Sequence, residues 1–308
     1  MRDRSLRVVI VAEESAGVQT LNALVGLRPA PEIVAVLTTT DSAGNGRALV
    51  REAAHRLGLE TASAELVRSR AFAKRLQDEA IDILINVHSL FVAHPEVVAA
   101  PRIGSFNLHP GPLPEYAGLN APSWAIYNGE ASHGVTLHWM DEHIDAGPVA
   151  WLERFELRDA DTGLSVMGQC VRRGVPLIVE LVQAAGQSPS SIPRVPQDRA
   201  RRRYFGAGPP SGGSLDWSWP AGEISRFVRA ADYAPFPSPW GHPQAVLEGR
   251  PVGIVKVAST GLPAEDPPGT VREITTTGAV VATGDELVVV DRIWLDGRYA
   301  KPMELMSH

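Results

Sequence analysis

The stretch LRVVIVAEESAGVQTLNALVGL, residues 6–27, determines the fold class. Its first part, Leu6 to Ala12, is a run of mostly apolar, β-branched residues with the length of a buried strand. From Val18 to Leu27 the apolar residues recur every three or four positions, which is the spacing of an amphipathic helix. A buried strand followed directly by a helix is typical of a β-α unit.

The same alternation continues along the chain on the C-terminal side of this unit. Strands alternating with helices at this spacing predict an α/β fold with a doubly wound, mostly parallel sheet. Ligands of such sheets bind beyond the carboxyl ends of the strands, so those ends are the places to inspect. The expected strands are Ile33–Leu37, Ile81–Ile85, Ile103–Leu108 and Gly134–Met140. The expected helices cover about 47–57 and 163–185, and a further one includes Thr61-Ala62-Ser63 and continues from Glu65 to about Ala80.

The composition changes after the last of these helices. Gln187 to Gly213 is rich in Ser, Pro, Arg and Gly, as in a linker or a surface crossing. We therefore predict an α/β domain over 1–190, a linker over 191–214 and a smaller β-rich domain over 215–308. In the last of these we expect a helix at Ala221–Ala231, with Ile224, Phe227 and Val228 on a buried face, and strands at Val252–Val257, Gly269–Ile274, Gly278–Thr283 and Glu286–Trp294.

Composition restricts the function classes. The chain has 308 residues and a single cysteine, Cys170, which excludes an internal disulfide framework and a Cys-rich metal site. Met1 to Ser5 leads straight into a strand-like run instead of a signal peptide, and no apolar run approaches the ~20 residues of a membrane span. We expect a cytoplasmic protein without a membrane partner. The formal charge of -6 opposes general affinity for nucleic acid.

Several cofactor and catalytic motifs are missing. The first strand–helix turn, Glu13-Glu14-Ser15-Ala16-Gly17, supplies one glycine where a dinucleotide fingerprint needs three. The sequence also lacks a P-loop, a G-x-S-x-G elbow and an H-E-x-x-H helix. A nicotinamide or flavin cofactor is therefore not expected.

Two polar stretches carry candidate chemistry. Asn107 and His109 end the strand before the rigid loop Pro110-Gly111-Pro112-Leu113-Pro114, and alternation places both side chains on one face. An amide and an imidazole held there suit a developing oxyanion. Asp145 ends the loop after the next strand, within reach of His109, where it would set the tautomer of the ring. A capped turn and an ordinary turn Asp explain the same residues, so pattern alone indicates an enzyme of unknown chemistry.

The other histidines are less informative. The His138 side chain either faces the pocket or is a hydrogen-bonded residue within the sheet, and both placements stay open. His88 and His94 are expected in loops. Cys170 lies in a helical pattern and is expected to be a small buried hydrophobic residue.

The stretch Phe106 to Val149 resembles the folate-dependent formyltransferases. That family has an N-x-H, a Pro-rich loop with a Tyr/Arg-x-Gly element, a G-V/T-T/S strand and a closing D-x-G. A weaker resemblance to the OB-like C-terminal domain of methionyl-tRNA formyltransferases extends over 215–217, 223–232, 268–271 and 281–285. The matching family elements in this sequence are Asn107-Leu108-His109, Leu113–Gly118, Gly134-Val135-Thr136 and Asp145-Ala146-Gly147.

The resemblance implies a mechanism and its residues. The donor in this family is 10-formyltetrahydrofolate, and an unprotonated amine attacks its formyl carbon. Asn107 and His109 would then donate to the oxyanion, while Asp145 would hold His109 and relay the amine proton. No metal is implied, because the formyl group is already an activated amide. The resemblance places the pterin against Ser89, Leu90, Phe91 and Val92 and against backbone around Met140, Asp141 and Ile144, although Leu90 and Phe91 equally suit a core.

The acceptor is less clear than the donor. The loop Thr40 to Arg47 lacks the longer basic insertion of methionyl-tRNA formyltransferases, and the family's usual H-x-S-L-L-P is changed at 109–114. A closer resemblance is to formyltransferase domains of nonribosomal peptide synthetases, at Gly111–Pro122, His133–His138, Arg203–Gly206 and Pro237–Gly241. This implies natural-product biosynthesis, with a small-molecule amine or an aminoacyl group on a carrier protein as acceptor.

Three other functions stay open. A sugar N-formyltransferase would use an amino sugar as its acceptor. A 10-formyltetrahydrofolate hydrolase would let water attack the same donor. A folate-binding or carrier-docking module would have an idle site. The sequence gives no indication of the oligomeric state.

Overall fold

The computed structural model describes residues 5–39 and 48–306, which fall into two compact units. The first unit comprises Met1–Gly118, Gly134–Phe155 and Gly168–Tyr204, and the second comprises Leu119–His133, Glu156–Met167 and Phe205–His308. The loop Thr40 to Arg47, on which the argument against tRNA partly depends, lies outside the described residues. The predicted domain boundaries at residues 190 and 215 stay a prediction.

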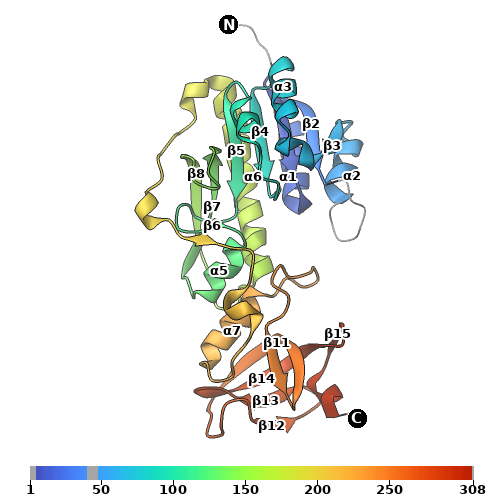
Figure 1. Cartoon of the computed structure of the whole chain (residues 1–308), viewed down its shortest axis with the longest axis vertical. Coiled ribbons are helices and arrows are strands. Elements are labelled where there is room, and N and C mark those ends of the chain that lie inside the picture. The colour runs from blue at the N-terminus through green and yellow to red at the C-terminus, as the bar shows by residue number, and fades with distance from the viewer. Residues whose placement is uncertain (1–4, 40–47, 307–308) are drawn as a thin grey trace. The chain divides into compact units, whose positions relative to one another are not determined.

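The first unit is built on a seven-stranded sheet with the order β3-β2-β1-β4-β5-β7-β8. Strand β1 is parallel to β2 and β4, and β4 is parallel to β5, whereas β7 runs antiparallel to β5. Figure 1 shows β2, β4 and β5 in one sheet, and β1 lies between β2 and β4, as the predicted mostly parallel sheet requires. The predicted fold class is confirmed. The strands are β1 Arg7–Ala12, β2 Glu32–Thr38, β3 Thr61–Ser63, β4 Ile83–Val87, β5 Gly104–His109, β7 Ser132–Trp139 and β8 Val149–Glu156.

Helices follow most of the parallel strands. The central strands are buried, as the continuous apolar runs of β1 and β4 require of strands covered on both faces. Ile10 and Ile85 are fully buried, and Phe72 and Leu76 of α3 pack in the core with Val9 and Leu84. The helical elements along this part of the chain are α1 Glu14–Val25, α2 Ala48–Arg56, η1 Ala64–Arg68, α3 Arg70–Asp78, α4 Pro95–Ala99 and α6 Gly163–Gln187.

Four local predictions were wrong or incomplete. Thr61–Ser63 is not the start of a helix but an edge strand, because Thr61 pairs with Val36 of β2. Ser69 has an extended backbone that separates η1 from α3, so the expected single helix is broken. Helix α1 begins at Glu14, earlier than its apolar periodicity indicates. Strand β8 was not predicted, because several of its residues are exposed and leave no continuous apolar run.

The second unit contains a curled antiparallel sheet with the order β10-β11-β14-β13-β12, and β15 pairs with β14. This confirms a β-rich C-terminal domain. Ile224, Phe227 and Val228 of α7 are buried, as the helical spacing predicted. The elements are α5 Ala121–Tyr127, α7 Ala221–Ala230, β10 Gln244–Leu247, β11 Arg250–Pro263, β12 Val271–Ile274, β13 Ala279–Ala282, β14 Glu286–Leu295 and β15 Arg298–Ala300.

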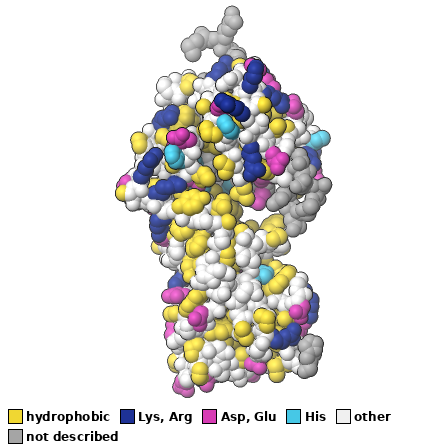
Figure 2. Space-filling model, viewed as in Figure 1, with side chains coloured by type: hydrophobic (Ala, Val, Ile, Leu, Met, Phe, Trp, Pro, Cys, Tyr) yellow, Lys and Arg dark blue, Asp and Glu magenta, His cyan; other side chains and the backbone are white. Residues whose placement is uncertain are grey.

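Three further observations concern the surface charges, the length of the helices and the grouping of metal-binding side chains. On the face drawn in Figure 2, Lys and Arg side chains are interspersed with Asp and Glu. Within residues 5–39 and 48–306, no helix is long and apolar enough to cross a membrane. The same residues contain no group of three or more His, Cys, Asp or Glu side chains arranged to hold a metal ion.

Candidate active site

Asn107 and His109 lie at the carboxyl end of β5, near the middle of the sheet. Their alternation along an extended strand turns both side chains to the same side. In the pairing register, Asn107 lies between Asn86 of β4 and His138 of β7. His109 is 3% exposed, so its imidazole is held within the protein.

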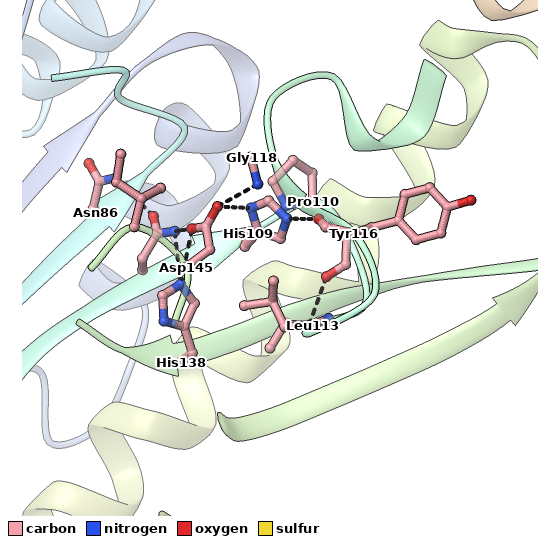
Figure 3. A network of polar contacts seen from close by, with 12 residues as sticks. Asn86, His109, Pro110, Leu113, Tyr116, Gly118, His138 and Asp145 are labelled. Carbon is pink, nitrogen blue, oxygen red and sulfur yellow. Dashed lines mark hydrogen bonds and ion pairs between the residues drawn. The ribbon is translucent and has the colours of Figure 1, made fainter. Parts of the chain in front are cut away.

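Asp145 reaches these residues from the loop that follows β7. Its backbone is left-handed, with a φ of 51°, a conformation that Asp tolerates better than most residues. The carboxylate Oδ2 accepts the Gly118 N–H at 2.8 Å and lies 3.6 Å from Nδ1 of His109. Its Oδ1 lies 3.4 Å from Nδ2 of Asn107. Figure 3 shows His109, His138 and Gly118 around this carboxylate. Asn107, His109 and Asp145, the three residues selected from the sequence, therefore lie together.

The surroundings of Asp145 favour its charged form. Burial opposes ionisation, but the attraction of His109, the interaction with His138 and the Gly118 N–H outweigh it. Together they hold the pKa of Asp145 well below its usual range. His109 donates from Nε2 to the Tyr116 carbonyl at 2.6 Å, which leaves Nδ1 as the ring atom facing Asp145. A doubly protonated His109 would therefore find an acceptor on each side.

The segment predicted as a linker holds the Asp145 loop. The Gln197 amide donates to the carbonyls of Asp145, at 3.1 Å, and Gly147, at 2.6 Å. Arg202 donates to the carbonyls of Asp145 and Ile144 at 3.0 and 2.8 Å. Gly147 is required because a Cβ there would lie 2.0 Å from the Trp139 carbonyl oxygen. The conformation of the Asp145 loop therefore depends on residues that lie about 50 positions after it in the sequence.

His138 and Asn86 join the site, although neither was assigned to it from the sequence. His138 is 2% exposed, and its Nε2 lies 3.1 Å from Nδ2 of Asn107 and 3.5 Å from Oδ1 of Asp145. Asn86 donates to Oδ1 of Asn107 at 2.8 Å. His138 is therefore both interior to the sheet and directed at the polar cluster, which combines the two placements left open above. An Asn inside an otherwise apolar strand was the available signal for Asn86.

A cavity of about 480 Å³ lies in the same unit, a volume in the range of small-molecule sites. Met140 and Asp141, two of the predicted pterin contacts, line it. Its other lining residues were not selected from the sequence, because they come from segments that meet only in the fold. They are Pro95, Val98, Ala99, Pro101, Ile103, Gly104, Ser105, Trp139, Glu142 and Arg194.

The other predicted pterin contacts are placed differently. Leu90, Val92 and Ile144 are exposed apolar side chains, whereas Phe91 packs against the core cluster that also contacts Met140. Ser89 is buried, and its carbonyl accepts a hydrogen bond from Asn86 at 3.2 Å. Their role as folate contacts stays a prediction.

Of the remaining histidines, His94 caps α4 by accepting the Glu96 N–H. His88 has a φ of 61°, and its buried Nε2 has no hydrogen-bond partner among the described atoms. Burial, with a smaller repulsion from His109, lowers the pKa of His88 to about 4, so this ring is neutral near neutral pH.

Comparison with known families agrees with this geometry. Residues 6–182 match the formyl transferase model, and residues 210–306 match the model of the formyl transferase C-terminal domain. The chain belongs to the formyl transferase family. The members of this family are folate-dependent enzymes that take the formyl group from 10-formyltetrahydrofolate.

The relatives in sequence are similar over nearly the whole chain. The chain is 32% identical to a methionyl-tRNA formyltransferase of Roseiflexus castenholzii over 305 residues, which cover 97% of this formyltransferase and 94% of the relative. A methionyl-tRNA formyltransferase of Roseiflexus sp. is 31% identical over 304 residues, covering 96% and 90%.

Solved structures share the fold. HypX from Aquifex aeolicus in complex with tetrahydrofolic acid superposes with a TM-score of 0.68 at 19% identity, over 98% of this chain. The match covers 47% of the HypX chain, so this formyltransferase spans about half of that protein. The N-formyltransferase from Helicobacter canadensis, in complex with folinic acid and dTDP-3-aminofucose, gives a TM-score of 0.66 at 17% identity, covering 93% and 99%.

Proposed function

We propose that this formyltransferase moves the formyl group of 10-formyltetrahydrofolate to an amine at Asn107, His109 and Asp145. The observation that carries the proposal is the convergence of these three side chains at the carboxyl end of β5. A parallel sheet places its ligands at such strand ends. The cluster combines an amide donor, an imidazole and an ionised carboxylate, which together suit acyl transfer to an amine.

The three residues divide the work of this reaction. The amine nitrogen attacks the formyl carbon, the bond from that carbon to N10 of the folate breaks, and the proton lost by the amine passes to N10. Asn107 and His109 donate hydrogen bonds to the oxygen that becomes negative during the attack. Asp145 stays ionised because its pKa is depressed, and it stabilises the positive charge that His109 acquires when it takes a proton.

The cavity is the proposed seat of the pterin. It is bounded by apolar groups such as Val98 and Met140, and Asp141 and Ser105 supply polar atoms at its wall. That combination suits a flat heteroaromatic ring with hydrogen-bonding edges. The exposed Leu90, Val92 and Ile144 are then available to contact the remainder of the folate.

For the acceptor we propose an amine of natural-product biosynthesis, either free or as an aminoacyl group on a carrier protein. The support is the resemblance of 111–122 and 203–206 to domains of peptide synthetases. An amino sugar is the nearest alternative among small amines.

Methionyl-tRNA is a second candidate, favoured by two observations. The relatives of 32% and 31% identity carry that activity in their names. In addition, Arg194, Arg199 and Arg201 to Arg203 lie in the segment that holds the Asp145 loop, so positive charge is concentrated there despite the overall charge of -6. A local basic segment of this kind suits an anionic acceptor.

One set of assays separates these functions. The full chain is incubated with 10-formyltetrahydrofolate alone, with small amines and amino sugars, with an aminoacyl carrier protein and with methionyl-tRNA, while tetrahydrofolate and product mass are followed. Product with one acceptor class identifies the transferase. Tetrahydrofolate release without an acceptor indicates the hydrolase, and folate binding without turnover in any arm would overturn the proposed function.

A further inference from the structure

Three polar side chains form a row across adjacent strands beside the candidate catalytic residues. Asn86 of β4 pairs in register with Asn107 of β5, and Asn107 pairs with His138 of β7. Asn86 is bonded to Asn107, and Asn107 is in turn bonded to His138. We propose that Asn86 and His138 are positioning residues that fix the Asn107 amide with its NH₂ group toward Asp145. The inference rests on the proposed function, because it concerns how that reaction obtains its oxyanion donor.

The two ends of the row set the direction of every hydrogen bond in it. Nδ1 of His138 lies 2.8 Å from the Trp139 carbonyl, which can only accept, so Nδ1 carries the hydrogen. Nε2 is then the ring atom that faces Asn107, at 3.1 Å, and in the tautomer with Nε2 unprotonated it accepts a hydrogen bond from the Asn107 amide. At the other end, the NH₂ of Asn86 donates to the Ser89 carbonyl at 3.2 Å and to Oδ1 of Asn107 at 2.8 Å.

Only one orientation of Asn107 satisfies these partners. A flipped amide would place Oδ1 against the lone pair of His138 Nε2 and the Asp145 carboxylate, and would direct its NH₂ at the NH₂ of Asn86. Both hydrogen bonds would be lost and like dipoles would face each other. Water replaces such partners poorly here, because His138 is 2% exposed and Asn86 is half-buried.

The orientation matters because the two ends of an amide act oppositely on an oxyanion. The NH₂ group stabilises the developing negative charge, whereas the carbonyl oxygen repels it. In the fixed orientation, one Asn107 N–H is held by His138 and the other makes a long contact of 3.4 Å with Asp145. The longer contact is the weaker one and is the one that yields to the oxyanion. Figure 3 shows Asn86 and His138 on different sides of this cluster.

The first test is kinetic and uses the full chain. Asn86→Asp removes the donor to Asn107 and adds a repelling carboxylate, and His138→Leu removes the acceptor at similar volume. Each should lower kcat by about 10- to 100-fold, a fraction of the loss of an oxyanion donor, with KM and folate affinity changed by less than about threefold. His138→Gln keeps an acceptor for Asn107 and should recover much of the loss. Asn22→Asp, on an exposed helical position, is the matched control.

Because both residues act through Asn107, the Asn86→Asp/His138→Leu double variant should lose much less than the product of the two single losses. Losses that multiply, a loss confined to KM, or His138→Gln as poor as His138→Leu would each overturn the proposal. A kcat within about twofold of the unaltered protein in both single variants would do so as well.

A second readout does not depend on turnover. The side-chain ¹⁵N–¹H₂ signals of Asn107, identified by their disappearance in Asn107→Asp, should exchange slowly in the unaltered protein. They should shift and exchange faster in Asn86→Asp and His138→Leu. Unchanged Asn107 signals in both variants would refute the positioning role, whereas absent formyl transfer with responsive signals would refute only the proposed function.

Discussion

Asp82 and Asp145 are both buried carboxylates of the first unit, 6% and 8% exposed, but their partners differ. Asp82 precedes β4 and is bonded to the Arg102 guanidinium, at 2.9 Å from its Nε, and to the backbone N–H of Arg7. Asp145 lies near the opposite end of the neighbouring strand β5. Its side-chain partners in the described part of the chain are two imidazoles and an amide.

The difference separates a structural carboxylate from a reactive one. A guanidinium keeps its proton under all ordinary conditions, so the positive charge that Arg102 places beside Asp82 does not change. An imidazole gains and loses a proton near neutral pH. A carboxylate flanked by imidazoles can therefore support a charge that appears and disappears during a reaction, which a carboxylate flanked by arginine cannot do.

The largest effect should come from the same isosteric change at these two positions. Asp145→Asn removes the charge that stabilises protonated His109 and should lower the transfer rate by about 1,000-fold or more, while the left-handed backbone is retained because Asn also tolerates it. Asp82→Asn should change the rate by less than about threefold under conditions in which both variants are folded. Single-turnover rates measure both. Equal losses at the two positions would break the distinction.

His109→Ala and Asn107→Ala should follow, each lowering turnover by about 100-fold or more, because each removes one oxyanion donor. Folate affinity, measured by calorimetry, should change little, since neither side chain lines the cavity. His55→Ala, at an exposed helical position, is the matched control for the loss of an imidazole. Near-normal turnover of either site variant at saturating substrates would refute the roles proposed for these residues.

The sequence predicted those site residues that short stretches of sequence are enough to identify. Asn107 and His109 lie two positions apart in one strand, and alternation along that strand is enough to place their side chains together. Asp145 was selected from its place in the loop after the next strand, and the D-x-G element of the resemblance supports that selection. The parallel strands β1, β2, β4 and β5 were predicted for the same reason, because both of their faces are buried.

The remaining features depend on pairing between distant segments, which one sequence does not contain. Asn86 becomes informative only when the register places it beside Asn107, and His138 only when β7 is found to run antiparallel to β5. Thr61–Ser63 was misassigned because its strand character comes from pairing with β2. The residues that hold the Asp145 loop, Gln197 and Arg202, lie in a segment whose composition indicated only a linker.

The third prediction concerns stability, for which Asp82 should matter although its replacement should hardly change the transfer rate. Asp82→Asn should lower the free energy of unfolding by about 2 kcal/mol, less than a fully buried ion pair would lose, because the Arg102 side chain is 48% exposed. Asp78→Asn, at an exposed pair with Lys74, should lower it by less than about 0.5 kcal/mol. Urea unfolding at neutral pH measures both. An Asp82→Asn loss no larger than that of Asp78→Asn would show that Asp82 has no structural role.

The smallest effect concerns Cys170, a buried acid that lacks the partners of Asp145. Its Sγ donates to the carbonyls of Pro110 and Gly134, and burial raises the pKa of the thiol far above its usual value despite the nearby charge of Arg173. The folded protein therefore keeps the thiol protonated at a pH where the unfolded chain loses that proton, so the stability contribution falls as the pH rises above about 8.5.

The measurable quantity is the difference in unfolding free energy between the unaltered protein and Cys170→Ala. This difference should shift against the unaltered protein by about 1–2 kcal/mol from about pH 8 to pH 10, while Cys170→Ala transfers formyl groups normally at neutral pH. For Asp145 the dependence has the opposite direction: its contribution is present above about pH 4 and is lost as the pH falls toward the depressed pKa. A difference for Cys170→Ala that does not vary with pH would mean that the folded thiol ionises like the unfolded one. Burial would then not suffice to keep this thiol neutral in the folded protein.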